Sequence, residues 1–257
     1  MLTRLRDSAR DLLYGVVEVA YPYTTITLGG EPFNVPFRWR KWFCDGYEEP
    51  TFDFIRAHCK PGATLIDIGA HFGIFTISAL RKVGPSGKVI SFEPCAATRS
   101  VLLKTLQLNG FSGIPEIRDE AVSNVAGQYS FFSSTIPGDA GNSLIGNAQH
   151  QTKSEVRTVR LDDIHLPRVD AIKIDAEGAE LQILEGSRAL ITKHRPAVLL
   201  SVHPMQIGRS GRSLSDLWGV LESLKLVPYL NDQRVSSEWF RGQTGLFDVC
   251  LEVRAWI

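Results

Sequence analysis

Apolar residues follow two different periods along the chain, and from residue 62 onward the two periods alternate. "ATLIDIG" (63–69) is a continuous apolar run of strand length, whereas "GIFTISALRKV" (73–83) repeats apolar residues at helical spacing. The same pair returns in "KVISFEP" (88–94) and "AATRSVLLKTLQLNG" (96–110), and the final glycine is typical of a helix end. This region therefore predicts strands and helices in turn.

The alternation continues in the second half of the chain. "EIRDEAVSN" (116–124) and "VDAIKID" (169–175) are strand-like, "GAELQILEGSRALI" (178–191) has helical spacing, and "PAVLLSVHP" (196–204) is another buried strand. Strands that alternate with helices favour an α/β fold, with a doubly wound and mostly parallel sheet.

The first part of the chain has a different pattern. An apolar stripe at helical spacing predicts a helix over residues 1–20, and "TTITLGG" (24–30) with "EPFNVPF" (31–37) predicts a hairpin. "FRWRKWF" (37–43) is interpreted as an edge strand with Phe37 and Trp39 inward, rather than as a surface that stacks on nucleic acid. We therefore expect an extension over 1–44 and one domain over 45–257.

Two polar, glycine-rich segments interrupt the alternation. Residues 133–155 and 203–213 are predicted to be loops, and long loops in compact domains are often functional.

Composition and charge exclude some functions. The 257 residues are 44% hydrophobic, and Lys+Arg and Asp+Glu both number 28, so the net charge is zero. Zero charge gives no electrostatic signal for a nucleic-acid partner. No apolar run is long enough to span a bilayer, and acidic residues interrupt the N-terminal stripe, so we expect a cytoplasmic protein.

Candidate chemistry begins in "LIDIGAHFGIF" (65–75). Asp67 lies in the strand and is followed by Gly69, Ala70 and Gly73, which opens a helix. Glycines allow a sharp turn close to a ligand, and a helix N-terminus offers unpaired N–H groups. Glu93 ends the next strand 20 residues after Gly73, a spacing typical of a carboxylate that accepts both ribose hydroxyls of a nucleoside.

The residues of the turn distinguish between two nucleoside cofactors. A dinucleotide site has G-x-G-x-x-G and faces a pyrophosphate, whereas this chain has D-I-G-A-H-F-G with Asp67 aimed at the turn. A carboxylate suits an ammonium or sulfonium group and is unfavourable beside pyrophosphate. The pattern favours S-adenosyl-L-methionine over NAD.

"DIGAHFG", "SFEP", "EAVSN" and above all "IKIDAEGAELQILEG" resemble the FkbM family of S-adenosylmethionine-dependent methyltransferases, within the class I methyltransferase fold. The resemblance extends from about residue 45 to about residue 204. It implies a Rossmann-like sheet of seven strands with one antiparallel edge strand. It also implies methyl transfer to an acceptor that is often a hydroxyl of a natural product or sugar.

The resemblance also implies roles for individual residues. Glu93 would hold the ribose, Glu120 would lie near the adenine, and Glu49 or its neighbour Glu48 would face the cofactor. The remaining residues expected around the cofactor are Asp67, Gly69, Ala70 and Gly73 at its methionine part, with His71 and Asp175 close by. Two departures affect these assignments: many members have Asn in place of His71, and many end the strand "PAVLLSVH" with Glu where this chain has Ser201, Val202 and His203.

A hydroxyl acceptor needs a group that takes up its proton. The candidate catalytic residues are Asp175, Glu177 and His203, since ligands bind at the carboxyl ends of the strands. Glu180 is expected to fix the turn instead. A metal ion held by Asp175, Glu177 and His203 is conceivable, but without a denser ligand set none is expected.

The leading interpretation is O-methylation of a small molecule, natural product or sugar. The alternatives are methylation of nitrogen, methylation of tRNA or protein, and a nucleoside-binding or NAD-dependent protein that kept the fold without this activity. S-adenosylhomocysteine is expected to raise the melting temperature, and NAD is not.

Overall fold

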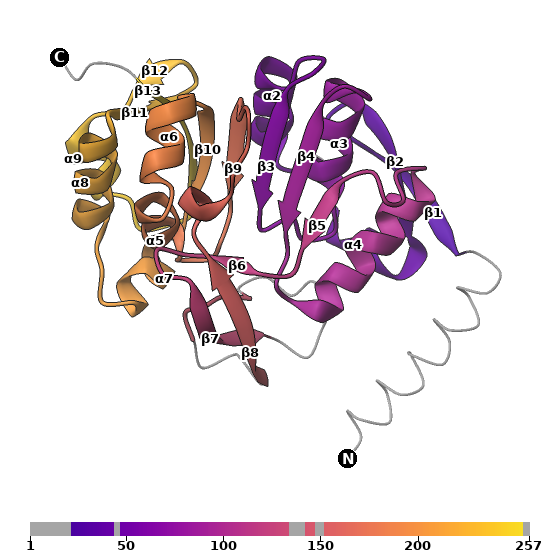
Figure 1. Cartoon of the computed structure of the whole chain (residues 1–257), viewed down its shortest axis with the longest axis horizontal. Coiled ribbons are helices and arrows are strands. Elements are labelled where there is room, and N and C mark those ends of the chain that lie inside the picture. Colours follow the sequence, from indigo (N-terminus) through magenta and orange to yellow (C-terminus); the bar gives the residue numbers. More distant parts are fainter. Residues whose placement is uncertain (1–21, 44–46, 134–141, 147–151, 254–257) are drawn as a thin grey trace.

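The computed structural model describes residues 22–43, 47–133, 142–146 and 152–253 (Figure 1). Its large sheet contains β3 (Thr64–Ile68), β4 (Lys88–Phe92), β5 (Glu116–Arg118), β9 (Ala171–Ile174), β10 (Ala197–Val202), β11 (Leu226–Leu230), β12 (Gln233–Arg234) and β13 (Phe247–Val253). The strand order is β12-β11-β13-β10-β9-β3-β4-β5. β10, β9, β3, β4 and β5 pair in parallel, which confirms the doubly wound and mostly parallel sheet.

The antiparallel strand lies inside the sheet, so its expected position at the edge is wrong. β13 pairs antiparallel with β10 on one side and with β11 on the other, and the two-residue β12 adds an eighth strand beyond β11. The chain reverses direction between β11 and β13. Because antiparallel strands need no crossover helix between them, β13 can return beside β11 and lie between it and β10.

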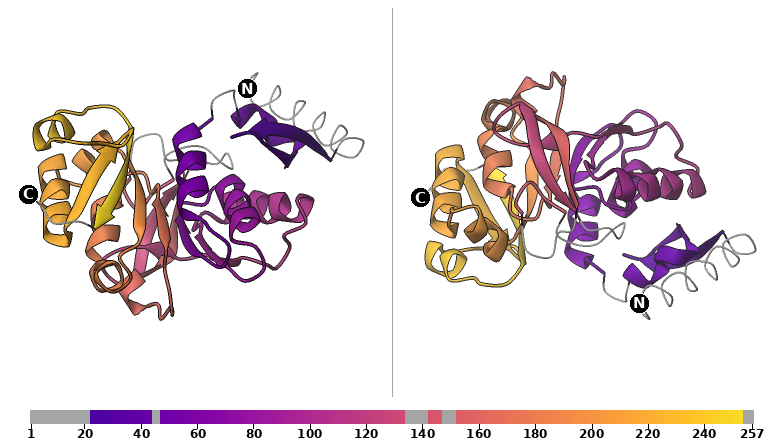
Figure 2. Two further views of the ribbon diagram at one scale, coloured as in Figure 1. Left: turned by 90° about the horizontal axis from the view of Figure 1, so that it is seen from above. Right: turned by 90° about the horizontal axis from the view of Figure 1, so that it is seen from below.

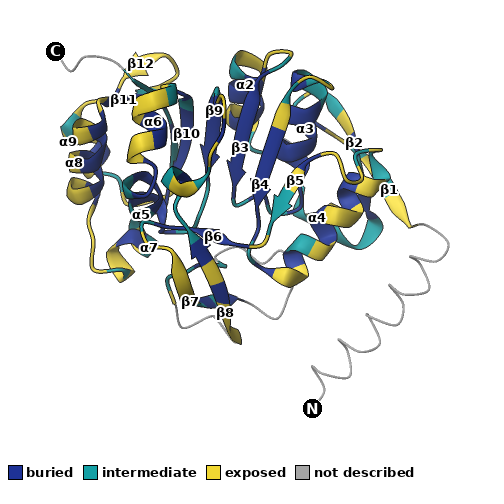
Figure 3. Cartoon of the chain, in the orientation of Figure 1, coloured by how far each residue is buried: buried dark blue, intermediate teal, exposed yellow. Residues whose placement is uncertain are grey.

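Helices cover both faces of the sheet because its strands are apolar on both faces (Figure 3). Leu65 and Val89 pack with α2 (Glu49–His58), α3 (Ile74–Val83) and α4 (Ala96–Leu108). Ile66 and Ile68 point to the opposite side, where α5 (Glu180–Glu185), α6 (Arg188–His194), α8 (Leu214–Leu224) and α9 (Ser237–Arg241) lie. Among the described residues, no helix has both the length and the apolar character to cross a bilayer.

The predicted hairpin is confirmed. β1 (Tyr23–Leu28) pairs antiparallel with β2 (Glu31–Pro36), and the Gly29–Gly30 turn adopts the left-handed conformation. Phe33 and Val35 join the same apolar cluster as Phe52 of α2. Figure 2 shows the hairpin beside the main body of the domain. The predicted helix over 1–20 lies outside the described residues, and the boundary at residue 44 stays a prediction.

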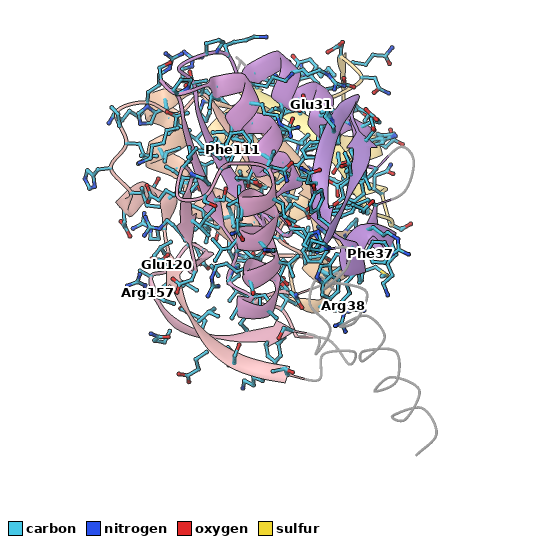
Figure 4. The ribbon with its side chains drawn as sticks, turned by 90° about the vertical axis from the view of Figure 1, so that its right-hand side faces the viewer. Glu31, Phe37, Arg38, Phe111, Glu120 and Arg157 are labelled. Carbon is cyan, nitrogen blue, oxygen red and sulfur yellow. The ribbon has the colours of Figure 1, made fainter. Side chains whose placement is uncertain are left out.

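The interpretation of residues 37–43 as an edge strand is wrong. They form the 3₁₀ helix η1 (Phe37–Trp42), which has three residues per turn. Trp39 and Trp42 are therefore on one side, and their ring centroids lie 5.5 and 6.5 Å from that of Phe72. Figure 4 shows Phe37 and Arg38 beside the hairpin.

A small sheet lies at the carboxyl ends of the large one (Figure 1). It contains β6 (Ala121–Val122), β8 (Thr152–Val159) and β7 (Gly127–Ser133), in that order. The predicted strand 116–124 is thus divided between two sheets, because β5 continues the large sheet and β6 pairs with β8.

Three predicted boundaries need correction. The loop predicted over 133–155 ends early because β8 begins at Thr152, and the loop predicted over 203–213 opens with α7 (Pro204–Arg209). The single helix predicted over 178–191 is two helices, α5 and α6, which are separated at Gly186. A Cβ at Gly186 would clash with the carbonyl oxygen of Ser123, so another chain segment crosses at this point.

Candidate active site

A cavity of about 260 Å³ opens at the carboxyl ends of the parallel strands. Its lining includes Ile68 at the end of β3, Phe92 at the end of β4 and Asp175 just after β9. β3 lies between β4 and β9 in the sheet. The cavity therefore occupies the position where doubly wound sheets bind their ligands.

Glu93 is held by the main chain at one side of this cavity. Its carboxylate accepts hydrogen bonds from the backbone N–H of His71 (2.9 Å, to Oε2) and of Cys95 (3.0 Å, to Oε1). Burial raises the pKa of Glu93 to about 7, although these hydrogen bonds and Arg99 oppose the rise. Each oxygen keeps a further lone pair, so the carboxylate can accept both hydroxyls of a ribose.

His71 contributes to this site through its backbone and its packing. Its φ of 50° is left-handed, its N–H binds Glu93, and its ring stacks on Phe72 with the centroids 4.0 Å apart. His71 also lines the cavity, near the position expected for it.

Gly69 allows two strand ends to meet beneath the cavity. Its φ is +76°, and a Cβ there would clash with the carbonyl oxygen of Asp175. Gly73, with a φ of +84°, is the N-cap of α3, and Ala70 lies in the cavity wall between the two glycines. Only glycine combines this conformation with so close an approach of backbone.

Of the two neighbouring glutamates, Glu48 lines the cavity and Glu49 does not. Glu49 is exposed in the first turn of α2, where its carboxylate lies 3.8 Å from Arg56, so Glu48 is the better placed of the two, and the expected contact of Glu49 with the cofactor stays a prediction. Burial raises the pKa of Glu48 to about 7; Lys173 opposes this shift and Asp175 adds to it.

Asp67 lies below the cavity rather than in its wall. Its carboxylate is fully buried, accepts a hydrogen bond from Thr76 Oγ1 (2.7 Å) and lies 3.7 Å from Lys173 Nζ. The expected contact of Asp67 with the cofactor stays a prediction; in the structure its carboxylate lies beside the ammonium of Lys173.

Lys173 is the main site residue that sequence reasoning missed. This buried lysine of β9 places Nζ 3.4 Å from Asp175 Oδ2 and 3.3 Å from the carbonyl oxygen of Gly69. Burial alone would lower the pKa of Lys173, but Asp175, Asp67 and Glu48 raise it above its ordinary value. The available signal was a single lysine within the apolar run "AIKI".

Glu120 lines the cavity at the small sheet, next to the apolar residues Ala121 and Val122. Its carboxylate pairs with Arg118 (2.9 Å) and with Arg157, and Figure 4 shows Glu120 and Arg157 side by side. The hydrogen bond from Arg118 is the largest cause that lowers the pKa of Glu120 to about 2. Glu120 therefore remains ionised, with arginines as its partners.

The three predicted catalytic residues come together after β9 and β10. His203 Nε2 lies 3.7 Å from Asp175 Oδ1 and 3.5 Å from Glu177 Oε2. Asp175 and Glu177 line the cavity, whereas His203 is buried behind them. Glu177 has a φ of 50°, a left-handed conformation that is uncommon for a residue with a side chain.

Glu180 fixes this turn, as expected. Its Oε1 accepts the N–H of Gly178 (2.9 Å) and lies 2.7 Å from His203 Nδ1. Burial lowers the pKa of His203, but Glu180, Glu177 and Asp175 outweigh it and raise the value to about 9.

Known proteins resemble this chain in sequence and in fold. Methyltransferase sdnD of Sordaria araneosa is 29% identical over 168 residues, and the match covers 50% of this chain and 64% of that protein. Methyltransferase 1 of Beauveria bassiana (strain ARSEF 2860) is 27% identical over 143 residues, with 48% of this chain and 57% of that protein covered. The chain thus matches less than two thirds of either relative's length.

A solved structure supports the fold. The S-adenosylmethionine-dependent O-methyltransferase from Thermotoga maritima has a TM-score of 0.50 at 12% identity, covering 92% of this chain and 80% of that chain. The family description "Methyltransferase FkbM domain" matches residues 67–225, more than half of the chain. The chain therefore belongs to the FkbM family of methyltransferases.

Proposed function

We propose that the chain transfers a methyl group from S-adenosylmethionine to a hydroxyl of a small molecule, such as a natural product or a sugar. One observation carries the proposal. The cavity combines Glu93, after β4, with Asp175 and Glu177, after β9, and β3 lies between these two strands. A nucleoside-binding carboxylate and acids able to take up a proton thus share one cavity.

The lining residues fit the cofactor. Glu93 would hold the ribose, and the apolar walls from Phe92, Val122 and Phe131 suit a purine ring. Glu48 and Asp175 would face the cationic methionine part. When bound, S-adenosylmethionine would supply an electrophilic methyl carbon, with S-adenosylhomocysteine as the thioether leaving group when the bond between this carbon and sulfur breaks.

The rest of the lining favours a small acceptor over a macromolecule. Trp42, Tyr47, Phe72 and Phe75 give the cavity an aromatic wall, and Tyr47 stacks on Phe75 with their centroids 5.9 Å apart. The whole cavity, with a volume of about 260 Å³, lies just below the usual range of small-molecule sites. Rigid aromatic walls bind rings and exclude water.

The acceptor hydroxyl must lose its proton as its oxygen bonds to the methyl carbon. Asp175 and Glu177 line the cavity, and one of these two carboxylates would receive this proton. His203, which lies behind them and is cationic at neutral pH in the free protein, would hold the two carboxylates in place.

A labelling experiment tests this proposal. The protein is incubated with S-adenosylmethionine labelled in its methyl group and with a panel of sugars, phenols, aliphatic alcohols, amines and tRNA. We expect label in a hydroxylated acceptor. Label confined to amines or tRNA would overturn the choice of hydroxyl and support one of the other acceptor classes.

Two variants test the proton-transfer assignment. Asp175→Asn and His203→Ala should each lose turnover, because both change the acidic cluster. His203→Ala should retain S-adenosylhomocysteine binding, whereas Asp175→Asn should bind it more weakly but still measurably, because Asp175 would face the methionine part and Glu93 stays intact. Asp53→Asn, an exposed acid on α2, is the control that should keep full turnover. Full activity in both site variants would contradict the assignment.

A further inference from the structure

Asp175, Glu177 and His203 form a compact set of possible metal ligands. One donor atom from each residue can be chosen so that all three lie within 4.8 Å of one another. The residues come from two segments, the turn after β9 and the end of β10, which the fold brings together. Two of the three line the cavity, so an ion between them would be accessible to a ligand there.

The separations between these atoms suit a common centre. Two ligands about 2.1 Å from an ion and about 110° apart are separated by about 3.4 Å. His203 Nε2 lies 3.5 Å from Glu177 Oε2 and 3.7 Å from Asp175 Oδ1. Small side-chain movements would therefore complete the site, and the backbone can remain in place.

Glu180 orients the histidine as a metal ligand requires. Its Oε1 lies 2.7 Å from His203 Nδ1 and is anchored by the N–H of Gly178. A carboxylate at Nδ1 holds the proton on that nitrogen, so the proton that a metal ion displaces on binding is the one on Nε2. Metal-binding histidines commonly have such a carboxylate partner.

The two carboxylate ligands are also held in place. Lys173 Nζ lies 3.4 Å from Asp175 Oδ2, and Gln206 Nε2 donates at 3.1 Å to Glu177 Oε2, the same oxygen that lies 3.5 Å from His203 Nε2. The fully buried Glu180 also has a second oxygen, Oε2, with no hydrogen-bond partner. Asp175, Glu177 and Glu180 surround His203, and Asp175 shares the ammonium of Lys173 with Asp67 and Glu48, so a divalent cation would supply further positive charge to this cluster.

We propose that Asp175, Glu177 and His203 bind a divalent cation at the acceptor side of the cavity. The binding stands on the geometry alone; its use in catalysis rests on the proposed function. A divalent ion lowers the pKa of a hydroxyl that it binds, so a weak base is then sufficient for the reaction.

The donor set indicates the class of ion. One imidazole nitrogen and two carboxylate oxygens suit Mn²⁺, Fe²⁺ or Zn²⁺ better than Ca²⁺, which takes six to eight oxygens. Mn²⁺ is the probe of choice because its electron paramagnetic resonance spectrum reports both binding and a coordinated nitrogen.

The test is a titration of the whole chain with Mn²⁺ after treatment with EDTA and dialysis. We expect one ion per chain, with a nitrogen coupling in the pulsed spectrum. His203→Gln should abolish the coupling, and Glu177→Gln and Asp175→Asn should weaken binding by at least about tenfold. Glu49→Gln, an exposed neighbour of the cavity, is the matched control and should bind like the wild type.

The same samples are titrated with S-adenosylhomocysteine, so that the two proposals are tested separately. Absence of Mn²⁺ binding, or equal binding in all variants, overturns the metal site, whereas S-adenosylhomocysteine binding would still support the methyltransferase. Loss of S-adenosylhomocysteine binding in the wild type would count against the proposed function instead. Circular dichroism of each variant verifies that it is folded.

Discussion

Lys173 is the residue on which the charge balance of the site depends. Its ammonium lies between Asp67, Asp175 and Glu48, and it is 2% exposed. A buried charge is tolerated only when it is paired, so the lysine and the carboxylates stabilise one another in the ionised form.

We predict that Lys173→Met lowers the free energy of unfolding by about 3–5 kcal/mol at pH 7, because it leaves buried carboxylates without a cation. Urea unfolding measures the loss. Lys88→Met is the matched control: its ion pair with Glu116 is on the surface, and such pairs contribute about 0–1 kcal/mol. Similar losses in the two variants would contradict the role of Lys173.

Under the proposed function, Glu93 should give cofactor binding a pH dependence. Because its pKa is about 7 in the free protein, a proton would have to leave before the carboxylate could hold the ribose as an ionised group. S-adenosylhomocysteine affinity should therefore fall by at least about tenfold from pH 8 to pH 6, as calorimetric titration would show.

The variant Glu93→Gln should bind more weakly and lose this part of the dependence. Glu48 also has a pKa of about 7, so its titration should account for the pH dependence that remains in Glu93→Gln. In the double variant Glu93→Gln, Glu48→Gln, the affinity should no longer change between pH 6 and pH 8 through either of these two groups. An unchanged pH profile in Glu93→Gln would show that Glu93 does not hold the ribose.

For single residues, the sequence identified those that lie at the ends of strands but not the side chains with which they pair. The positions of Glu93 and Asp175 follow from the strand pattern. Whether Glu48 or Glu49 faces inward depends on the left-handed Glu48 before α2, with a φ of 42°, and a strand pattern does not encode that. Asp67 on β3 pairs with Lys173 on the neighbouring strand β9, and the spacing of residues along the sequence does not reveal which strands are neighbours.

The turn from β3 to α3 is the element on which the site is built. Gly69 brings β3 against the end of β9, and Gly73 begins α3 beside the cavity.

We predict that Gly69→Ala is more destabilising than Gly84→Ala. Both glycines have positive φ, but a Cβ at Gly84 meets nothing within 4 Å, whereas at Gly69 it would clash with Asp175. The additional cost of overpacking is about 1–3 kcal/mol, and urea unfolding of both variants measures it. Equal losses would show that β9 can move away from the turn.

The apolar runs located the strands and helices around the cavity, because buried parallel strands have a distinctive composition. Residues 37–43 were misinterpreted because alternating aromatic and basic residues are also typical of an edge strand. The same residues form a 3₁₀ helix, in which Trp39 packs against Phe72. The small sheet was missed because β6 and β8 pair across 29 residues or more of intervening chain.

For the whole molecule, family motifs and fold agree. The central strands pair in parallel, as the doubly wound sheet predicts, and the sheet is buried on both faces. The position of β13 inside the sheet could not be predicted from the apolar pattern, because the pattern along one strand does not indicate which strands pair with it.

The most direct test of the central claim is the melting temperature of the whole chain with S-adenosylhomocysteine and, separately, with NAD. At about 100 times its dissociation constant a ligand adds about 2.7 kcal/mol, which for a chain of this size is about 5–10 °C. We predict a rise of this order with S-adenosylhomocysteine, none with NAD, and a smaller rise in Glu93→Gln. A rise with NAD, or none with S-adenosylhomocysteine, would contradict the assignment of this cavity to methyl transfer.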